Sequence, residues 1–415
     1  MKKISFIVMG IVLMLTSCAS NNVDTDSTTE KTTIELTSIT EYKLPDTGQS
    51  FTYDENGLLV EDVDEDSPYW GSDATVEGNA LSYQDNGDGT VTDLNTGLMW
   101  QKTPDFTRYT YDEALEYVEN LEIGGYDDWR LPTIKELYSL AYFNGEIIPE
   151  GESHPYIDTD YFDFEYDHLL FAGQYWSSTT YVKNGVQNYD EHGSLLGGFG
   201  FNFADGHIKS YETGYYFDGT EISEDDGIMI PGCYVRAVRG TTTLYDMDYT
   251  DNGDGTVTDN STHLMWAQDD SIETMDWLEA LEYANESELA GYSDWRLPNS
   301  KELESLVDYE KTDFPAINTD FFNTSVTEFD YVDDAYYVWT STTQGDFKYS
   351  ACYVAFGQAW SKKNSEADTY YDWHGAGAQR SDPKTGNPED YELASEMASD
   401  YISINNYVRL VRDAD

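Results

Sequence analysis

The sequence predicts a protein of mixed helix and strand, built from two tandem copies of one domain. Asp85 to Trp100 reads DNGDGTVTDLNTGLMW, and Asp251 to Trp266 reads DNGDGTVTDNSTHLMW, with 13 of 16 positions identical. A second block, GYDDWRLPTIKELYSL from Gly125, returns as GYSDWRLPNSKELESL from Gly291. Both pairs are 166 residues apart. A constant offset of this length indicates a duplicated domain and not a short solenoid repeat.

The composition of the 415 residues suits two globular domains, because 39% are hydrophobic and 15% aromatic. The 22 basic and 80 acidic residues give a formal net charge of −58. A charge of this sign opposes binding to nucleic acid and to anionic lipid. Solubility is the favoured explanation of the acidity, and cation binding by clustered carboxylates is the alternative.

The N-terminus has the pattern of a bacterial lipoprotein signal. Two lysines precede the apolar stretch Ile4 to Leu15, which is too short to cross a membrane. Leu-Thr-Ser-Cys then ends at Cys18, the expected lipidation site; a plain secretory signal with an incidental cysteine is the alternative. We therefore expect a signal peptide at 1–17 and a flexible tether at 18–43. The expected location is the bacterial cell envelope, at the outer membrane because no aspartate follows the cysteine.

The first repeated block predicts a β-hairpin. Residues 86–89 and 95–97 are turn signals, and Val91 and 98–100 supply the apolar side of two strands. The Asp-rich turn invites a calcium site, but it does not fit the EF-hand template, because Asn95 stands where the template needs Glu. A turn that requires glycine at positive φ is favoured, with calcium as the alternative.

Two helices are expected in each repeat. Thr110 to Glu113 and Thr133 to Glu136 are capping boxes, and Asn299 with Glu302 repeats the second one. The leucines of these helices should face the core: Leu137, Leu140, Leu303 and Leu306. For Arg130 we favour a structural role, satisfying loop carbonyls or a carboxylate, over binding of an anion.

The second half of each repeat is strand-like. Residues 175–179 correspond to 338–342, and the alternating YVRAVR at 234–239 corresponds to YVRLVR at 407–412. The alternation predicts a closing strand with one apolar face. The expected domains are 44–242 and 243–415, with a lead-in, 44–82, attached to the first.

Several motifs together resemble one family. They are DTGQ at 46–49, the LMW hairpin, DWRLP-x2-KEL, WSST at 176–179 and YVRxVR, and they are typical of the C-terminal domain of the Legionella collagen-like protein, Lcl. The resemblance covers about 370 residues. It implies an α+β fold similar to C-type-lectin-like and sulfatase-modifying-factor-like domains, with a β-hairpin, two helices and an antiparallel sheet. It also implies an adhesin-like role, since the family includes a surface adhesin that binds sulfated polysaccharides.

This chain departs from that pattern. It has no collagen-like region, and its charge of −58 does not suit a polyanionic ligand. It contains no Gly-x-Ser-x-Gly, no His-Glu-x-x-His and no phosphate loop, so we expect no enzyme and no cofactor. Cys233 and Cys352 are not equivalent in the two repeats; we expect them to be unpaired, with a disulfide between the domains as the alternative.

The expected function is binding or adhesion at the envelope, with a glycan or a surface protein as partner and the membrane reached only through the lipid. The domains diverge at a Gly-rich loop, 193–200, an acidic loop, 212–232, and a long excursion, 361–403. The candidate contacts are Trp176, Asn202 and Asp205 in the first domain and Trp360, Tyr371 and Trp373 in the second. Core packing is favoured for Trp176, and a self-packed loop is the alternative for the second set. The alternative functions are a structural envelope lipoprotein without a small ligand, or an envelope enzyme.

Overall fold

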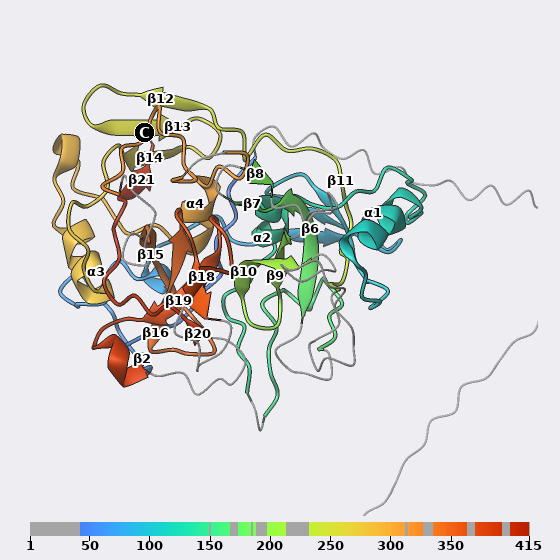
Figure 1. The fold of residues 1–415 in the computed structure, drawn as a ribbon, viewed down its shortest axis with the longest axis horizontal. Helices are drawn as coiled ribbons and strands as arrows, with labels where there is room; N and C mark the ends of the chain where they lie inside the picture. The colour runs from blue at the N-terminus through green and yellow to red at the C-terminus, as the bar shows by residue number, and fades with distance from the viewer. Residues whose placement is uncertain are drawn as a thin grey trace, which may run out of the picture. The chain divides into compact units, whose positions relative to one another are not determined.

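The computed structural model places the two repeats in one compact unit, from Ile39 to Asp415 (Figure 1). It describes residues 42–148, 151–166, 173–183, 186–187, 197–212, 232–311, 314–326, 335–362, 370–391 and 399–414. The predicted signal peptide, tether and Cys18 lie outside these residues, so they stay predictions. Within the described ranges, no helix is long and apolar enough to cross a membrane.

The first repeat and its lead-in contain short strands and two α-helices. The elements are β1 Thr52–Tyr53, β2 Leu59–Val60, η1 Asp73–Thr75, β3 Tyr83–Asp85, β4 Thr90–Asp93, β5 Met99–Gln101, α1 Tyr111–Glu119, α2 Ile134–Ser139, β6 Gln174–Thr180, β7 Val182–Lys183, β8 Val186–Gln187, β9 Gly197–Asn202, β10 His207–Glu212 and β11 Val238–Arg239. This composition of small sheets and few helices is an α+β arrangement.

The second repeat follows the same order and adds a small sheet. Its elements are β12 Tyr249–Asp251, β13 Thr256–Asp259, β14 Leu264–Ala267, α3 Trp277–Asn285, η3 Leu289–Gly291, α4 Ser300–Ser305, β15 Tyr337–Thr343, β16 Ser350–Ala355, β17 Trp360–Lys362, β18 Tyr370–Asp372, β19 Gln379–Pro383, η5 Pro388–Tyr391, β20 Ser399–Asp400 and β21 Val411–Asp413. The added sheet has the order β18-β17-β20.

Each repeat opens with a four-stranded antiparallel sheet that its own C-terminal strand completes. The orders are β11-β5-β4-β3 and β12-β13-β14-β21, and the register is the same in both, with Thr92 opposite Met99 and Thr258 opposite Met265. The hairpin turn has Gly87 at φ 74° and Gly89 at φ 90°, a region that glycine reaches without steric cost. The predicted turn role of these glycines is confirmed.

A second, three-stranded antiparallel sheet follows in each repeat, with the orders β10-β9-β6 and β15-β16-β19. Residues 197–200 of the Gly-rich segment that was expected to be a loop belong to strand β9 instead, and the rest of that segment lies outside the described residues, as does most of the predicted acidic loop. The glycines of β9 are needed for close packing: a Cβ atom added at Gly200 would lie 2.5 Å from the carbonyl oxygen of Tyr175. This requirement is invisible in the sequence, where a run of glycines is typical of a loop.

The predicted caps and core leucines are confirmed. Thr110, Thr133 and Asn299 each form a capping box with the glutamate three residues later. The glutamate of α2 also binds Arg130 through two hydrogen bonds of 2.7 and 2.6 Å, and Arg296 binds Glu302 in the same way. The structural role predicted for the arginine of the Trp-Arg-Leu-Pro motif is therefore confirmed. All four core leucines of α2 and α4 are fully buried.

The closing segments differ from the prediction at their arginines. Alternation placed Arg236 and Arg409 on a polar face, yet both side chains are fully buried. The guanidinium of Arg236 donates to the carbonyl oxygens of Gln101, Lys102 and Asp163 at 2.7–2.9 Å. Arg409 repeats this arrangement in the second repeat. Five donors in a rigid plane can satisfy several loop carbonyls at once, which stabilises a buried irregular backbone.

The two repeats meet through helices α2 and α4, which lie side by side (Figure 1). Each helix supplies a lysine to the other. Lys135 Nζ donates to the carbonyl oxygen of Ser305 at 2.7 Å, and Lys301 Nζ donates to that of Ser139 at 2.8 Å. Each serine is the last residue of its helix, so each ammonium caps the negative end of the opposite helix. Both lysines are buried and occupy the same position of the KEL motif.

The lead-in contacts both repeats. Gln49 exchanges two hydrogen bonds with the backbone of Thr343, at 2.9 and 2.7 Å, and Phe143 N donates to the carbonyl oxygen of Thr47 at 2.9 Å. The buried carboxylate of Asp73 accepts hydrogen bonds from the hydroxyls of Thr47 and Thr342. Residues far apart in the sequence are thereby held at one junction.

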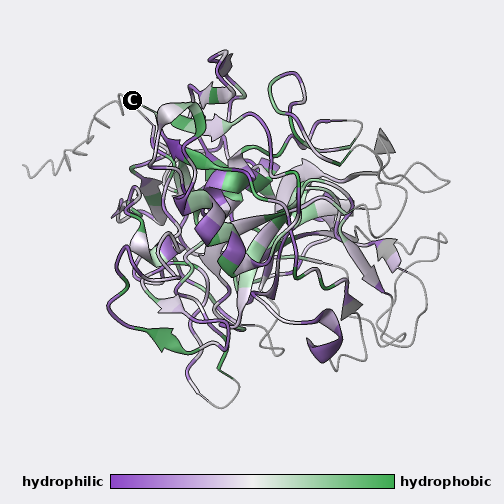
Figure 2. Ribbon diagram, turned by 90° about the vertical axis from the view of Figure 1, so that its left-hand side faces the viewer, coloured by the Kyte–Doolittle hydropathy of each residue, from purple (hydrophilic) through white to green (hydrophobic). Residues whose placement is uncertain are grey.

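Hydrophilic and apolar residues alternate along the central helices and strands, as Figure 2 shows.

The duplicated arginine–glutamate pairs provide a matched stability test. Glu302→Gln should lower the free energy of unfolding by about 2–4 kcal/mol, because it leaves the largely buried guanidinium of Arg296 with only the exposed carboxylate of Asp413. Glu136→Gln should cost only about 1–2 kcal/mol, since the side chain of Arg130 is 37% exposed against 15% for Arg296. Urea unfolding of the two variants measures the difference. A loss at Glu136 equal to or larger than that at Glu302 would contradict this ranking.

The exchanged lysines should make stability depend on pH. Burial lowers the pKa of Lys301 from 10.5 to about 7 and that of Lys135 to about 8. Between these values and 10.5 the unfolded chain binds more protons than the folded chain, so the stability that each lysine contributes rises with pH. The stability loss caused by Lys301→Met should therefore grow between pH 7 and about 10, and that of Lys135→Met should begin to grow near pH 8.

Unfolding free energies of the wild type and both lysine variants at several pH values test this dependence. Lys301 Nζ also donates to the carbonyl oxygen of Asp46 at 2.7 Å, so Lys301→Met should show the larger pH-independent loss, and the comparison rests on how each loss changes with pH. A loss that is constant or shrinks as the pH rises would show that the lysines are not held in the buried state described above.

Candidate functional site

Two predicted ligand contacts of the first repeat lie in its core, and both assignments are corrected. Trp176 is fully buried in β6, and its indole N–H donates to the carbonyl oxygen of Tyr109 at 2.8 Å. This is the core role that the sequence favoured for it. Asn202 is also fully buried, and its side-chain oxygen accepts a hydrogen bond from Ala204 N at 3.0 Å. Neither side chain is accessible to a ligand, because each is used by the fold.

The predicted contacts of the second repeat gather on the sheet β18-β17-β20. Trp360 begins β17 opposite Asp372 of β18, and Trp373 follows β18 directly; both tryptophans are half-buried. The backbone of Tyr371 lies in β18, and its side chain is outside the described residues. The excursion at 361–403, which was expected to be one long loop, therefore includes the strands β18, β19 and β20.

Asp205 belongs to a polar connection between the repeats. Its carboxylate accepts a hydrogen bond from His207 N at 3.2 Å, and the ring Nε2 of His207 lies 3.2 Å from the hydroxyl of Ser381 on β19. Nearby, His374 Nε2 lies 2.8 Å from a carboxylate oxygen of Asp400. Burial lowers the pKa of His207, and it lowers that of His374 to about 4, so both rings are neutral at neutral pH. The contact between His207 and Ser381 joins β10 to β19, and the contact between His374 and Asp400 joins the segment after β18 to β20.

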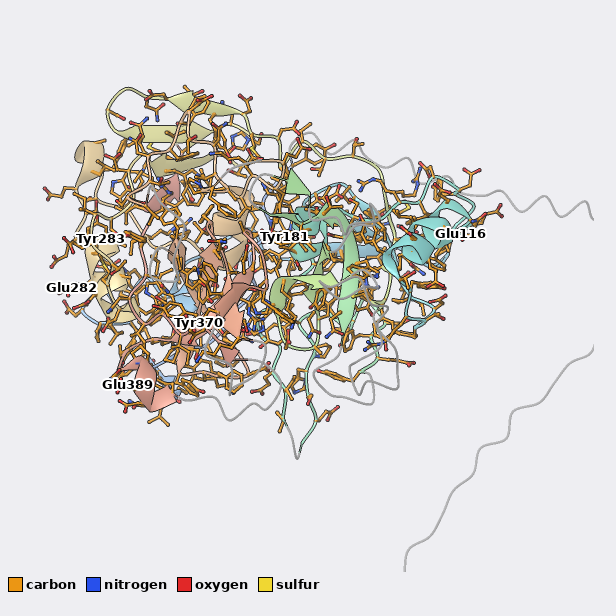
Figure 3. All side chains as sticks on the ribbon, viewed as in Figure 1. Glu116, Tyr181, Glu282, Tyr283, Tyr370 and Glu389 are labelled. Carbon is orange, nitrogen blue, oxygen red and sulfur yellow. The ribbon has the colours of Figure 1, made fainter. Side chains whose placement is uncertain are left out.

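A shallow groove lies beside α1. Its volume is about 330 Å³, within the range of roughly 300–1,000 Å³ that holds small ligands. It is lined by six residues: Tyr109, Glu113, Glu116, Tyr117, Asn120 and Leu121. Glu116 is labelled in Figure 3. Five of the six come from one face of α1 and its C-terminal cap, because residues three and four apart share a helix face.

Two tyrosines form the aromatic wall of this groove. The rings of Tyr109 and Tyr117 stack with centroids 4.9 Å apart at 30°. The hydroxyl of Tyr109 donates to Asp105 at 2.5 Å, and that of Tyr117 accepts a hydrogen bond from the side-chain amide of Gln101 at 3.0 Å. Burial, together with the hydrogen bond to Asp105, raises the pKa of Tyr109 to about 12, so this hydroxyl stays protonated. The stacked pair is therefore held in place before any ligand arrives.

Acidic side chains complete the groove. The nine residues of α1 include four acids, Asp112, Glu113, Glu116 and Glu119, and no base. Glu113 accepts the capping hydrogen bond from Thr110 N at 2.9 Å, whereas Glu116 is exposed. No Lys, Arg or His lines the groove. The site thus offers aromatic carbon beside carboxylate and amide oxygens, a combination that recognises polar, hydroxyl- or amine-bearing groups.

The second repeat does not reproduce the groove. At the offset of 166 residues, Met275 stands in place of Tyr109, Glu286 in place of Asn120 and Ser287 in place of Leu121. Glu282 and Tyr283, the counterparts of Glu116 and Tyr117, are retained and exposed (Figure 3). The end of α3 also receives the lead-in, since the side chain of Asn285 donates to the carbonyl oxygen of Trp70 at 2.8 Å. The helix is duplicated, but the ligand-sized hollow belongs to the first repeat.

A smaller hollow lies where the lead-in meets both repeats. Its volume is about 70 Å³, and its lining includes Gln49, Tyr53, Glu146 and Lys348. Lys348 Nζ lies 2.5 Å from Glu146, and the amide of Gln49 is engaged by the backbone of Thr343. The polar groups are thus occupied within the protein, and the volume suits a few water molecules better than a saccharide.

Both cysteines of the described residues are buried. Cys233 and Cys352 are free thiols, as the sequence interpretation favoured, and burial raises the pKa of both far above the usual range. Over the part of the chain that the structure describes, no group of three or more His, Cys, Asp or Glu side chains is placed to hold a metal ion. The α1 groove is therefore the candidate site that the geometry supports best.

The sequence does not single out the groove residues, because most of them belong to a duplicated helix whose pattern indicates a structural role. The available signal was the difference between the copies: four acids in the nine residues of α1, against two in those of α3. Stacking of Tyr109 on Tyr117 depends on where the chain enters the helix, which only the folded structure shows.

Comparison with known proteins supplies the family. The family model described as the Lcl C-terminal domain matches residues 89–219 and 255–374, which together make up more than half of the chain. Searches of curated proteins and of solved structures found no match. The two matched segments include the two hairpins and the two capped helix pairs described above. The chain belongs to the Lcl C-terminal domain family and carries two copies of that domain in tandem.

Proposed function

We propose that this protein is a lipid-anchored binding protein of the bacterial cell envelope, and that it recognises a glycan through the α1 groove. The single observation that carries the proposal is the ligand-sized hollow of about 330 Å³ with a stacked tyrosine pair on its wall. Aromatic faces bind the apolar faces of sugar rings, and carboxylate and amide oxygens bind their hydroxyls.

The location rests on the N-terminal sequence. The apolar stretch ending in Leu-Thr-Ser-Cys would direct the chain to export, and acylation of Cys18 would anchor it, in our interpretation at the outer membrane. Residues 18–43 would then act as the tether between the lipid and the compact unit. The lectin-like architecture is part of the proposal, and it rests on the family together with the antiparallel sheets of each repeat.

A structural envelope role without a ligand is the main competing function, and a surface protein is the competing partner. The fold provides many contacts between the repeats, which an inert spacer would also need. The groove discriminates between these functions, because a spacer has no use for a stacked aromatic pair beside exposed polar side chains.

The test is binding of the soluble chain from Asn21 onward to a glycan array, followed by variants. Tyr117→Ala should weaken binding of the array ligand by about tenfold or more, because a stacked aromatic contact contributes on the order of 1–2 kcal/mol. Tyr283→Ala, the matched change in the second repeat, should leave the affinity unchanged. Asn120→Ala changes an exposed groove residue and should weaken binding, at a small cost in stability because its side chain also donates to the carbonyl oxygen of Glu116.

Thermal melts of all three variants separate loss of binding from loss of structure. An array that stays silent would move the function to a protein partner or to a structural role. Equal losses in Tyr117→Ala and Tyr283→Ala would show that the ligand does not occupy the α1 groove.

A further inference from the structure

We infer that the glycan bound by the α1 groove carries free amino groups, so that its ligand class is an amino sugar in the cationic form. This inference rests on the proposed function and names the chemistry of the ligand at the same site. The argument comes from the charge around the groove, the position of the groove on the helix and the contrast with the second repeat.

The groove is a concentrated negative field without an internal counter-ion. Glu113 and Glu116 are three residues apart on α1, as are Glu116 and Glu119, and like charges at this spacing repel each other. No base occurs in α1 or in the groove lining. A ligand ammonium would relieve this repulsion, whereas a sulfate or carboxylate group would add to it.

The helix itself adds to the field. Glu116, Tyr117 and the C-cap Asn120 lie at the C-terminal end of α1, where the helix dipole places partial negative charge and where no basic side chain offsets it. A cation at this end is stabilised by the carboxylates and by the negative end of the helix dipole. The tyrosine rings contribute further, because an ammonium is attracted to the electron-rich face of a phenol ring.

The aromatic pair selects a sugar from among cationic ligands. A flexible polyamine or a lysine side chain needs only the carboxylates, whereas a pyranose ring also covers a stacked aromatic surface and exchanges hydrogen bonds with an amide such as Asn120. A volume of about 330 Å³ is far more than an isolated ammonium group requires. We therefore assign the site to an amino-sugar unit and not to a basic peptide.

The second repeat explains why a duplicated helix would not duplicate the site. Met275 stands in place of Tyr109, so the aromatic partner of the stacked pair is not repeated beside α3. The end of α3 instead binds the lead-in, because the side chain of Asn285 donates to the carbonyl oxygen of Trp70. Glu282 nevertheless remains exposed on α3, as Figure 3 shows, at the position that corresponds to Glu116. This residue supplies a control that removes the same single charge from the same highly acidic chain at a distance from the groove.

The experiment uses the soluble chain from Asn21 onward and three probes: a β-1,4-linked glucosamine hexamer, the same hexamer fully N-acetylated, and hexalysine. Titration calorimetry at low salt should show the glucosamine hexamer binding about tenfold or more tightly than the acetylated form, since acetylation removes the charge. Raising the salt concentration should weaken binding of the charged hexamer. Glu116→Gln should weaken it several-fold, whereas Glu282→Gln should not.

The outcomes distinguish this inference from the proposed function. If the acetylated hexamer or another neutral array glycan binds as tightly, and Tyr117→Ala weakens it, glycan binding at the groove stands and the cationic class is overturned. If Glu282→Gln weakens binding as much as Glu116→Gln, the attraction comes from the overall charge and the inference fails. Hexalysine binding as tightly, with the same sensitivity to Glu116→Gln, would overturn the assignment to a sugar.

Discussion

The exchange of two buried lysines between helices α2 and α4 is the constraint on which the arrangement of the repeats depends. Each ammonium satisfies carbonyl oxygens at the end of the opposite helix, at 2.7 and 2.8 Å, where water cannot reach them. A buried charge without such a partner would be strongly unfavourable. The two helices can therefore pack only in the orientation in which both lysines find their acceptors, and the other inter-repeat contacts are built around that geometry.

The lead-in reinforces the same junction from outside the repeats. Gln49 and Asp73 reach β15 of the second repeat, while Thr47 pairs with the first. A single segment before the duplicated sequence thus serves both copies, and the unit from Ile39 to Asp415 is compact as a whole. It also makes the copies unequal, because its backbone at Trp70 accepts a hydrogen bond from Asn285 at the end of α3.

Some residues of the duplicated domain keep the same structural role in both copies, whereas other residues differ between the copies. The Trp-Arg-Leu-Pro arginine, the capping glutamate and the KEL lysine have the same structural partners in both copies. Most of the acidic surface has no such task, and a charge of −58 shapes which ligands can approach it.

The sequence by itself determined the features that depend on neighbours along the chain. Hairpin turns, capping boxes and the facing of Leu137 or Leu303 are set by local backbone geometry and helical periodicity, and these predictions are confirmed. The repeat offset and the motifs also sufficed for the family. Local patterns could not show that Arg236 is buried, since its acceptors come from segments far away in the chain.

The tertiary structure alone decided which surface residues form a site. Trp176 and Asn202 were plausible contacts by residue type, but long-range packing uses both in the core. The groove beside α1 includes Tyr109, which precedes the helix and stacks on Tyr117 inside it. The corresponding end of α3 instead forms a hydrogen bond with the lead-in. Hollows form where packing leaves space, and packing depends on contacts between distant segments, which a sequence read locally does not contain.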